Sequence, residues 1–145
     1  MQETLISQPF SVYVSYSRTD ILRLERFVPA LRDVGCRVMM DSGQAIDHFD
    51  TLAERLNEDI HACDVMVVAL SPAAVESDWV QRETNLAQQL AKPIIPILLR
   101  AVVKLPDNLA HYQSIDLREK ERLDQQVSRL IAALHGLHAG MAAGG

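Results

Sequence analysis

The chain has 145 residues, of which 48% are hydrophobic and 23% charged, and its formal net charge at pH 7 is −5. This length and composition are typical of one globular domain with a substantial core. The acidic balance, with no densely basic stretch, argues against direct nucleic-acid binding. Cys36 and Cys63 fit no metal or CxxC spacing, so we expect buried free thiols and a reducing compartment.

No targeting or membrane segment is visible in the sequence. Residues 1–8 lack a basic region followed by an apolar run. The longest apolar stretches, at 65–70 and 93–103, are too short to cross a bilayer. We therefore expect a soluble, cytoplasmic protein with no membrane partner.

Strands and helices alternate through the first half of the chain. Residues 10–15 are β-branched and aromatic, as in a strand. Apolar residues recur at helical spacing over 20–34, and Gly35 is expected to end that helix. A second strand follows at 36–40, then a loop at 42–49 and an amphipathic helix at 50–62.

The same alternation continues to the C-terminus. Residues 65–70 form a wholly apolar third strand, which is followed by a loop at 71–76 and a helix at 79–91. Prolines in 93–99 indicate a fourth strand close to an edge or a strand end. A short fifth strand is predicted at 114–117 and a last helix at 120–134. The Gly- and Ala-rich tail, 135–145, is expected to fray.

This pattern predicts an α/β fold: a flavodoxin-like five-stranded parallel sheet of order 2-1-3-4-5, with helices on both faces. In such sheets ligands bind beyond the carboxyl ends of the strands, where the strand order reverses. That point lies between strands one and three. The loop 15–20 follows the first of these strands, and the third leads into the segment 77–83.

The segment 77–83, SDWVQRE, is the most informative in the chain. Trp79 is the only tryptophan, and Glu83 follows it by four residues, so on a helix the two side chains share a face. An aromatic ring beside a carboxylate suits a nucleotide with a cationic ring and a cleavable sugar bond. The alternative is a core tryptophan with a solvated glutamate, and Ser77 is a good helix N-cap on either interpretation.

Several other sites common in such folds do not fit. A phosphoryl receiver needs an aspartate where Ser71 stands, and only Asp20 remains of the acidic pair expected after strand one. No GxGxxG, GxxxxGK[ST] or GxSxG motif occurs. His135 and His138 are three residues apart beside a fraying end, so a metal site there is not expected.

Five segments, in the right order, resemble those of a TIR (Toll/interleukin-1 receptor) domain, and they span roughly residues 10–134. The segments are FSVYVSYSRTD at 10–20, LRDVGCRVMMD at 31–41, CDVMVVALSP at 63–72, SDWVQRE at 77–83 and KPIIPI at 92–97. Because Glu83 follows Trp79 by four, the resemblance is to bacterial NAD-cleaving members. It implies a domain at 10–135, with an extension at 1–9 and a flexible tail at 136–145.

The resemblance implies an enzyme that cleaves the nicotinamide–ribose bond of NAD+ on self-association. NAD+ is then a substrate, and no cofactor or metal is required. Glu83 would be the catalytic residue. The implied substrate-binding residues are Ser15, Tyr16, Ser17, Arg18, Asp41, Ser77 and Trp79. The implied self-association loop, 41–49, includes Ser42, Gly43, His48 and Phe49.

The chemistry agrees with these residue types. Nicotinamide leaves NAD+ as a neutral molecule, so no general acid is needed and one carboxylate can suffice. Trp79 could stack on a ring and Arg18 could pair with the pyrophosphate. Simpler roles stay open: Tyr16 capping the sheet, Arg18 solvated, and Asp41 as a turn residue.

The sequence leaves three roles open. The first is an antiphage immune effector or signal producer, alone or with a separate sensor or effector protein. The second is a non-enzymatic TIR adaptor, and the third a virulence protein that mimics host TIR domains. Treating Glu83 as a helix-surface residue, we expect Glu83→Ala to abolish NAD+ loss and leave the fold intact.

Overall fold

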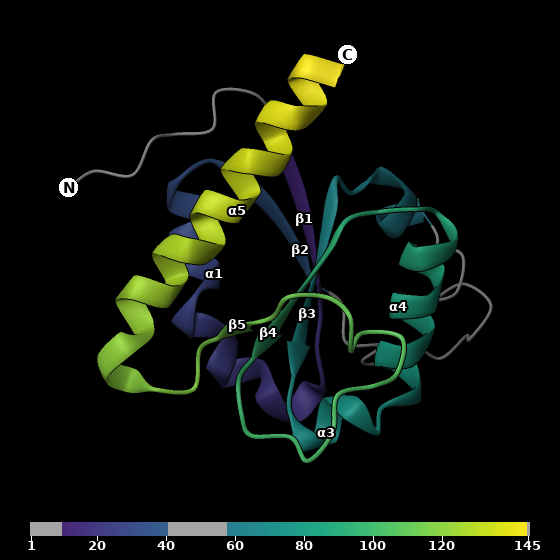
Figure 1. Cartoon of the computed structure of the whole chain (residues 1–145), viewed down its shortest axis with the longest axis vertical. Coiled ribbons are helices and arrows are strands. Elements are labelled where there is room, and N and C mark those ends of the chain that lie inside the picture. The colour runs from purple at the N-terminus through teal and green to yellow at the C-terminus, as the bar shows by residue number, and fades with distance from the viewer. Residues whose placement is uncertain (1–9, 41–57, 145) are drawn as a thin grey trace.

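The computed structural model describes residues 10–40 and 58–144 (Figure 1). Its sheet contains β1 (Phe10–Ser15), β2 (Cys36–Met40), β3 (Val65–Leu70), β4 (Ile94–Leu98) and β5 (Ile115–Asp116). The strands lie in the order β2-β1-β3-β4-β5, and every neighbouring pair is parallel. The predicted flavodoxin-like order is confirmed, and the point of reversal lies at β1 and β3.

Helices cover both faces of this sheet (Figure 1). They are η1 (Arg18–Arg26), α1 (Val28–Asp33), α3 (Pro72–Val75), α4 (Asp78–Gln89), η2 (Lys120–Arg122) and α5 (Leu123–Gly144). Residues 58–62 are also helical. Gly35, with φ 100°, follows α1 as predicted. Among the described residues, none of the helices has the length and hydropathy needed to span a membrane.

The predicted helix at 20–34 is two helices that meet at Phe27. The first is a 3₁₀-helix and the second begins at Val28, with Pro29 in its first turn. Proline has no N–H to donate to the carbonyl four residues earlier, so one continuous α-helix could not keep its hydrogen bonds here. Proline also disfavours α geometry at the preceding residue.

Two further expectations were wrong. The predicted loop at 71–76 contains α3, because the Ser71 side chain caps it by accepting from the Ala74 amide at 3.1 Å and Pro72 fits its first turn. The last helix was also predicted to end at 134, but α5 continues to Gly144; fraying of this tail stays a prediction. Its glycines lower helix stability without preventing the helix, and His138 packs edge-on against Phe10, with ring centroids 5.3 Å apart.

Two apolar clusters fill the space on either side of the sheet. The larger cluster joins Phe10, Val12 and Val14 of β1 to α1 and α5. The smaller joins Tyr13 to α3, α4 and Ile60. Successive side chains of a strand point to opposite faces, so β1 contributes its even positions to one cluster and Tyr13 to the other. Cys36 and Cys63 are buried free thiols, as predicted.

Candidate active site

Glu83 is buried in the second turn of α4, with none of its surface exposed. The Ser77 hydroxyl begins this helix by accepting from the Val80 amide at 3.2 Å, which confirms the N-cap prediction. From that start, Glu83 lies on the side of α4 that faces the sheet, together with Val80, Thr84 and Ala87. The interpretation of Glu83 as a solvated or surface residue was therefore wrong.

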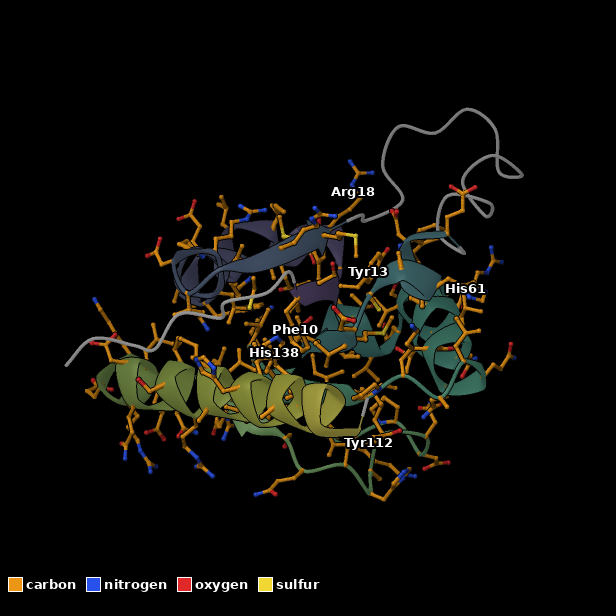
Figure 2. All side chains as sticks on the ribbon, turned by 90° about the horizontal axis from the view of Figure 1, so that it is seen from above. Phe10, Tyr13, Arg18, His61, Tyr112 and His138 are labelled. Carbon is orange, nitrogen blue, oxygen red and sulfur yellow. The ribbon has the colours of Figure 1, made fainter. Side chains whose placement is uncertain are left out.

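Two hydroxyl groups of β1 donate to the Glu83 carboxylate. The Tyr13 hydroxyl donates to Oε2, and the Ser15 hydroxyl donates to Oε1 at 2.8 Å. All three residues are completely buried. Tyr13 and Ser15 are two positions apart, so both point from β1 towards α4. Figure 2 shows Tyr13 inside the molecule and Arg18 projecting from its periphery.

Burial of the Glu83 carboxylate carries a large desolvation cost. A carboxylate removed from water loses much hydration energy unless donors replace it. Hydroxyl donors on both oxygens provide part of that replacement, and hydrogen bonds to an ionised acceptor are stronger than neutral ones. A buried, hydrogen-bonded carboxylate at a strand end where ligands bind is a candidate functional group on physical grounds.

The other predicted substrate-binding residues do not all gather at Glu83. Ser15 contacts it directly. Trp79 is half-buried and packs against the smaller cluster, one turn before Glu83. Ser17 is half-buried and Arg18 exposed at the start of η1. Their roles in substrate binding stay predictions.

Tyr16 lies on the opposite side of the sheet from Glu83. It is 5% exposed and belongs to the larger apolar cluster. As an even-numbered position it follows Phe10, Val12 and Val14 towards α1 and α5, so its packing agrees with the sheet-capping alternative. Asp41, Ser42, Gly43, His48 and Phe49 lie outside the described residues.

A second buried polar pair lies at the same edge of the sheet. Asp20, 1% exposed, accepts a hydrogen bond from the Ser71 hydroxyl. Arg23 pairs with the other oxygen of Asp20 at 3.2 Å. Because Asp20 follows β1 and Ser71 follows β3, the pair connects η1 to the start of α3. Nothing in the sequence pattern indicates that Asp20 and Ser71 pair with each other.

Tyr13 is the site residue that sequence analysis missed altogether. From the sequence, Tyr13 is one of the β-branched and aromatic residues that predict a strand at 10–15. The available signal was the period of two in β1: Ser11, Tyr13 and Ser15 are hydroxyl-bearing residues on one face, and α4 was expected to cover a face of that sheet. Only the packing of α4 places a carboxylate opposite them.

The groove and the two cysteines of the described residues lie away from Glu83. A small groove between α3, α4 and the segment after β4 is lined by residues that include Val80, Thr84 and Leu109, but not by Glu83. Burial raises the pKa of Cys36 and of Cys63 to about 11. Residues 10–40 and 58–144 contain no group of three or more His, Cys, Asp or Glu placed to hold a metal ion.

Comparison with solved structures gives the same fold. The TIR domain of the Toll-related receptor TRR-2 from Hydra magnipapillata is 21% identical with a TM-score of 0.71, over 86% of this chain and 97% of that one. The TIR domains of the activated Roq1 resistosome are 14% identical with a TM-score of 0.62, over 86% and 99%. The CMP N-glycosidase BcmB of Clostridium botulinum is 21% identical with a TM-score of 0.56, over 79% and 96%. At these identities the likeness concerns the fold alone.

Comparison with curated protein sequences gave no match. The family model for the TIR domain, in contrast, matches residues 12–131. That range begins at Val12 in β1 and ends at Ile131 in α5, and it includes Glu83 with both of its hydroxyl donors. The chain belongs to the TIR domain family.

Proposed function

We propose that this TIR domain is an NAD+ glycohydrolase in which Glu83 is the catalytic residue. The observation that carries the proposal is the buried Glu83 carboxylate, which accepts from Tyr13 and Ser15 where β1 ends. A fold that needed only apolar packing between α4 and β1 gains little from a desolvated carboxylate.

The reaction breaks the bond between the nicotinamide nitrogen and C1′ of the ribose. The bonding pair leaves with the ring, which becomes neutral nicotinamide, and positive charge develops on the sugar. A carboxylate stabilises this oxocarbenium-like sugar or holds its hydroxyls. Water then adds to C1′ and loses a proton, giving ADP-ribose. If a nucleophilic atom of the ADP-ribosyl group bonds to C1′ in place of water and releases any proton that it carries, the product is cyclic.

Two other predicted residues would bind the rest of the nucleotide. The half-buried Trp79 ring would stack on a base or on nicotinamide. The exposed Arg18 guanidinium would pair with the pyrophosphate, which Arg binds with two parallel hydrogen bonds. The name of the neighbour BcmB, a CMP N-glycosidase, supports cleavage of a nucleotide's N-glycosidic bond as the reaction class.

Burial of Glu83 sets a condition on this function. Its side chain and that of Ser15 are both 0% exposed, so a substrate hydroxyl can reach Oε1 only after local rearrangement at the end of β1. Active-site hydrogen bonds commonly change on substrate binding. The proposal thus includes an opening step before chemistry.

The direct test is incubation of concentrated protein with NAD+, with products separated by chromatography and identified by mass spectrometry. We expect nicotinamide with ADP-ribose or a cyclic isomer. Glu83→Gln keeps the volume and removes the charge, and should slow the reaction at least ~10²-fold. Glu76→Gln changes an exposed carboxylate seven residues away and should leave the rate unchanged. Normal turnover by folded Glu83→Gln protein would rule out the mechanism.

We further propose that activity depends on self-association and serves a bacterial immune response. Support comes from membership of the family and from the assembled TIR neighbours, the Roq1 resistosome and the RPS4–RRS1 heterodimer. If a neighbouring copy completes the site, the rate should rise more than linearly with protein concentration. Strict proportionality over a wide dilution series, in the presence of saturating NAD+, would contradict this part of the proposal.

An interaction module without catalysis is the second candidate, either an adaptor or a mimic of host TIR domains. The same hydrogen bonds favour it in part, since Tyr13, Ser15 and Glu83 also fasten α4 to β1. In that case wild-type protein would assemble but release no nicotinamide at any concentration. Glu83→Gln would then alter unfolding and leave assembly as it is.

A further inference from the structure

We infer that Tyr13 is a positioning residue for the Glu83 carboxylate, with a role distinct from that of Ser15. The inference deepens the proposed function and rests on it for its kinetic part. Tyr13 holds Oε2 and Ser15 holds Oε1, so each donor governs one oxygen. Tyr13 acts through Glu83 and makes no contact with substrate.

The two donors approach the carboxylate from different depths. Tyr13 pairs with Met66 in the sheet, whereas Ser15 pairs with Val68 and is the last residue of β1. Two residues of a strand span about 7 Å. Tyr13 therefore reaches Glu83 from within the smaller apolar cluster, and Ser15 reaches it from the carboxyl edge of the sheet, where a ligand of this fold arrives.

Because of this difference in depth, we expect the two hydrogen bonds to respond differently when substrate binds. A ribose hydroxyl entering from the edge meets Oε1 first and replaces the Ser15 hydroxyl as its donor. The Tyr13 bond to Oε2 lies on the core side and persists in the substrate complex. Tyr13 would thus fix the orientation of the carboxylate and favour its ionised form in both states, while Ser15 would do so only before substrate binds.

The other ionisable groups near this edge are the same in the Tyr13→Phe and Ser15→Ala variants. Asp20 is held by Ser71 and Arg23. On α4 itself, Asp78 and Arg82 are exposed. Because Tyr13→Phe and Ser15→Ala change none of these charges, a difference between the two variants reports on their own hydroxyls.

Kinetic pH profiles separate the two roles. The profile of kcat/KM reports groups of the free enzyme, and that of kcat reports groups of the substrate complex. We expect Tyr13→Phe to move the acidic limb of both profiles to higher pH by about one unit, the size expected for a lost hydrogen bond to a charged group. Ser15→Ala should move the acidic limb of kcat/KM and leave that of kcat in place. Equal behaviour of the two variants would overturn the inference.

A measurement without substrate tests the anchor independently of the proposed reaction. With ¹³C-labelled glutamate, the Glu83 carboxyl signal is assigned by its loss in Glu83→Gln and followed through a pH titration. Tyr13→Phe should raise its midpoint by about one unit. Replacement of Tyr13 by 3-fluorotyrosine, a stronger donor of nearly equal volume, should lower the midpoint, which covers the case in which Tyr13→Phe does not fold.

The outcomes separate the two proposals. An unchanged midpoint with 3-fluorotyrosine, or with folded Tyr13→Phe, would overturn the role of Tyr13 even if the wild type consumes NAD+. A shifted midpoint in a protein that never consumes NAD+ would support Tyr13 as the anchor of Glu83 and reject the glycohydrolase.

Discussion

The two faces of the sheet are built on different principles. On the side of α1 and α5, β1 presents Phe10, Val12 and Val14, and the buried cluster there is large and apolar. On the side of α3 and α4, the same strand presents Tyr13 and Ser15 to a buried carboxylate. One strand thus supplies packing to one face and hydroxyl groups to the other.

The difference shows where the fold tolerates polar atoms. The larger cluster supplies much of the apolar burial that stabilises the domain, so the smaller face can hold groups whose desolvation is costly. Those groups lie where β1 and β3 end, Ser15 with Glu83 and Ser71 with Asp20. Substitutions on the two faces should therefore separate stability from activity.

The largest stability effect is expected on the apolar face. Leu130 in α5 is 0% exposed, and Leu130→Ala should lower the free energy of unfolding by about 3 kcal/mol through lost burial and the remaining cavity. The NAD+ turnover of the folded fraction should not change. Urea unfolding measures the first and product release the second. Leu22→Ala, at a site 78% exposed, is the matched control, and a similar loss in both variants would refute the assignment of the core.

A smaller effect is expected at Glu83, and it corrects the expectation drawn from sequence. Glu83→Ala removes the acceptor of the Tyr13 and Ser15 hydroxyls inside a closed site, which should cost about 2 kcal/mol of unfolding free energy. Glu83→Gln keeps an acceptor and should cost less. Loss of activity in Glu83→Ala alone is therefore ambiguous. A change below ~0.5 kcal/mol would show that Glu83 behaves as a surface residue.

The last prediction concerns the cysteines, one in each cluster. Burial raises the pKa of Cys36 and of Cys63 to about 11 from 9.0, so at pH 7 only ~10⁻⁴ of each is thiolate and native protein should resist iodoacetamide. The unfolded chain releases its thiol protons at lower pH than the folded chain. Stability should consequently fall as pH rises from about 9 to 11. Peptide mapping after alkylation compares the faces, and faster labelling of Cys63 would indicate easier opening of the α4 side.

Most of the fold was predictable because the hydrophobic periodicity and the residues that end helices and strands agree along the chain. The strand at 65–70 is wholly apolar and buried, and Gly35 ends α1 as expected. The misses depend on single residues or on tertiary packing. Pro29 divides the segment with a regular apolar pattern into η1 and α1. The helix α5 continues past Gly136 and Gly140, and its His138 packs edge-on against Phe10.

The candidate site was predictable only in part. Spacing on α4 indicated that Glu83 and Trp79 share a face, and the resemblance to TIR domains implied a role for Glu83, Trp79 and Ser15. Burial of Glu83 could not be predicted, because an apolar pattern assigns a glutamate to the solvent side of a helix. The partner Tyr13 is 70 positions away in sequence, and only the three-dimensional packing of α4 on β1 brings the two together.

The two outer strands restrict how copies of this domain could join. β5 is two residues long, and the carboxylate of its second residue, Asp116, accepts hydrogen bonds from the backbone and guanidinium of Arg118. So short a strand is a poor template for adding a strand from another chain. β2 has five residues and, within residues 10–40 and 58–144, pairs with β1 alone. A filament formed by continuous hydrogen bonding of sheets would need two long free edges per copy. If copies of this domain associate as proposed, we therefore expect them to do so through side-chain surfaces.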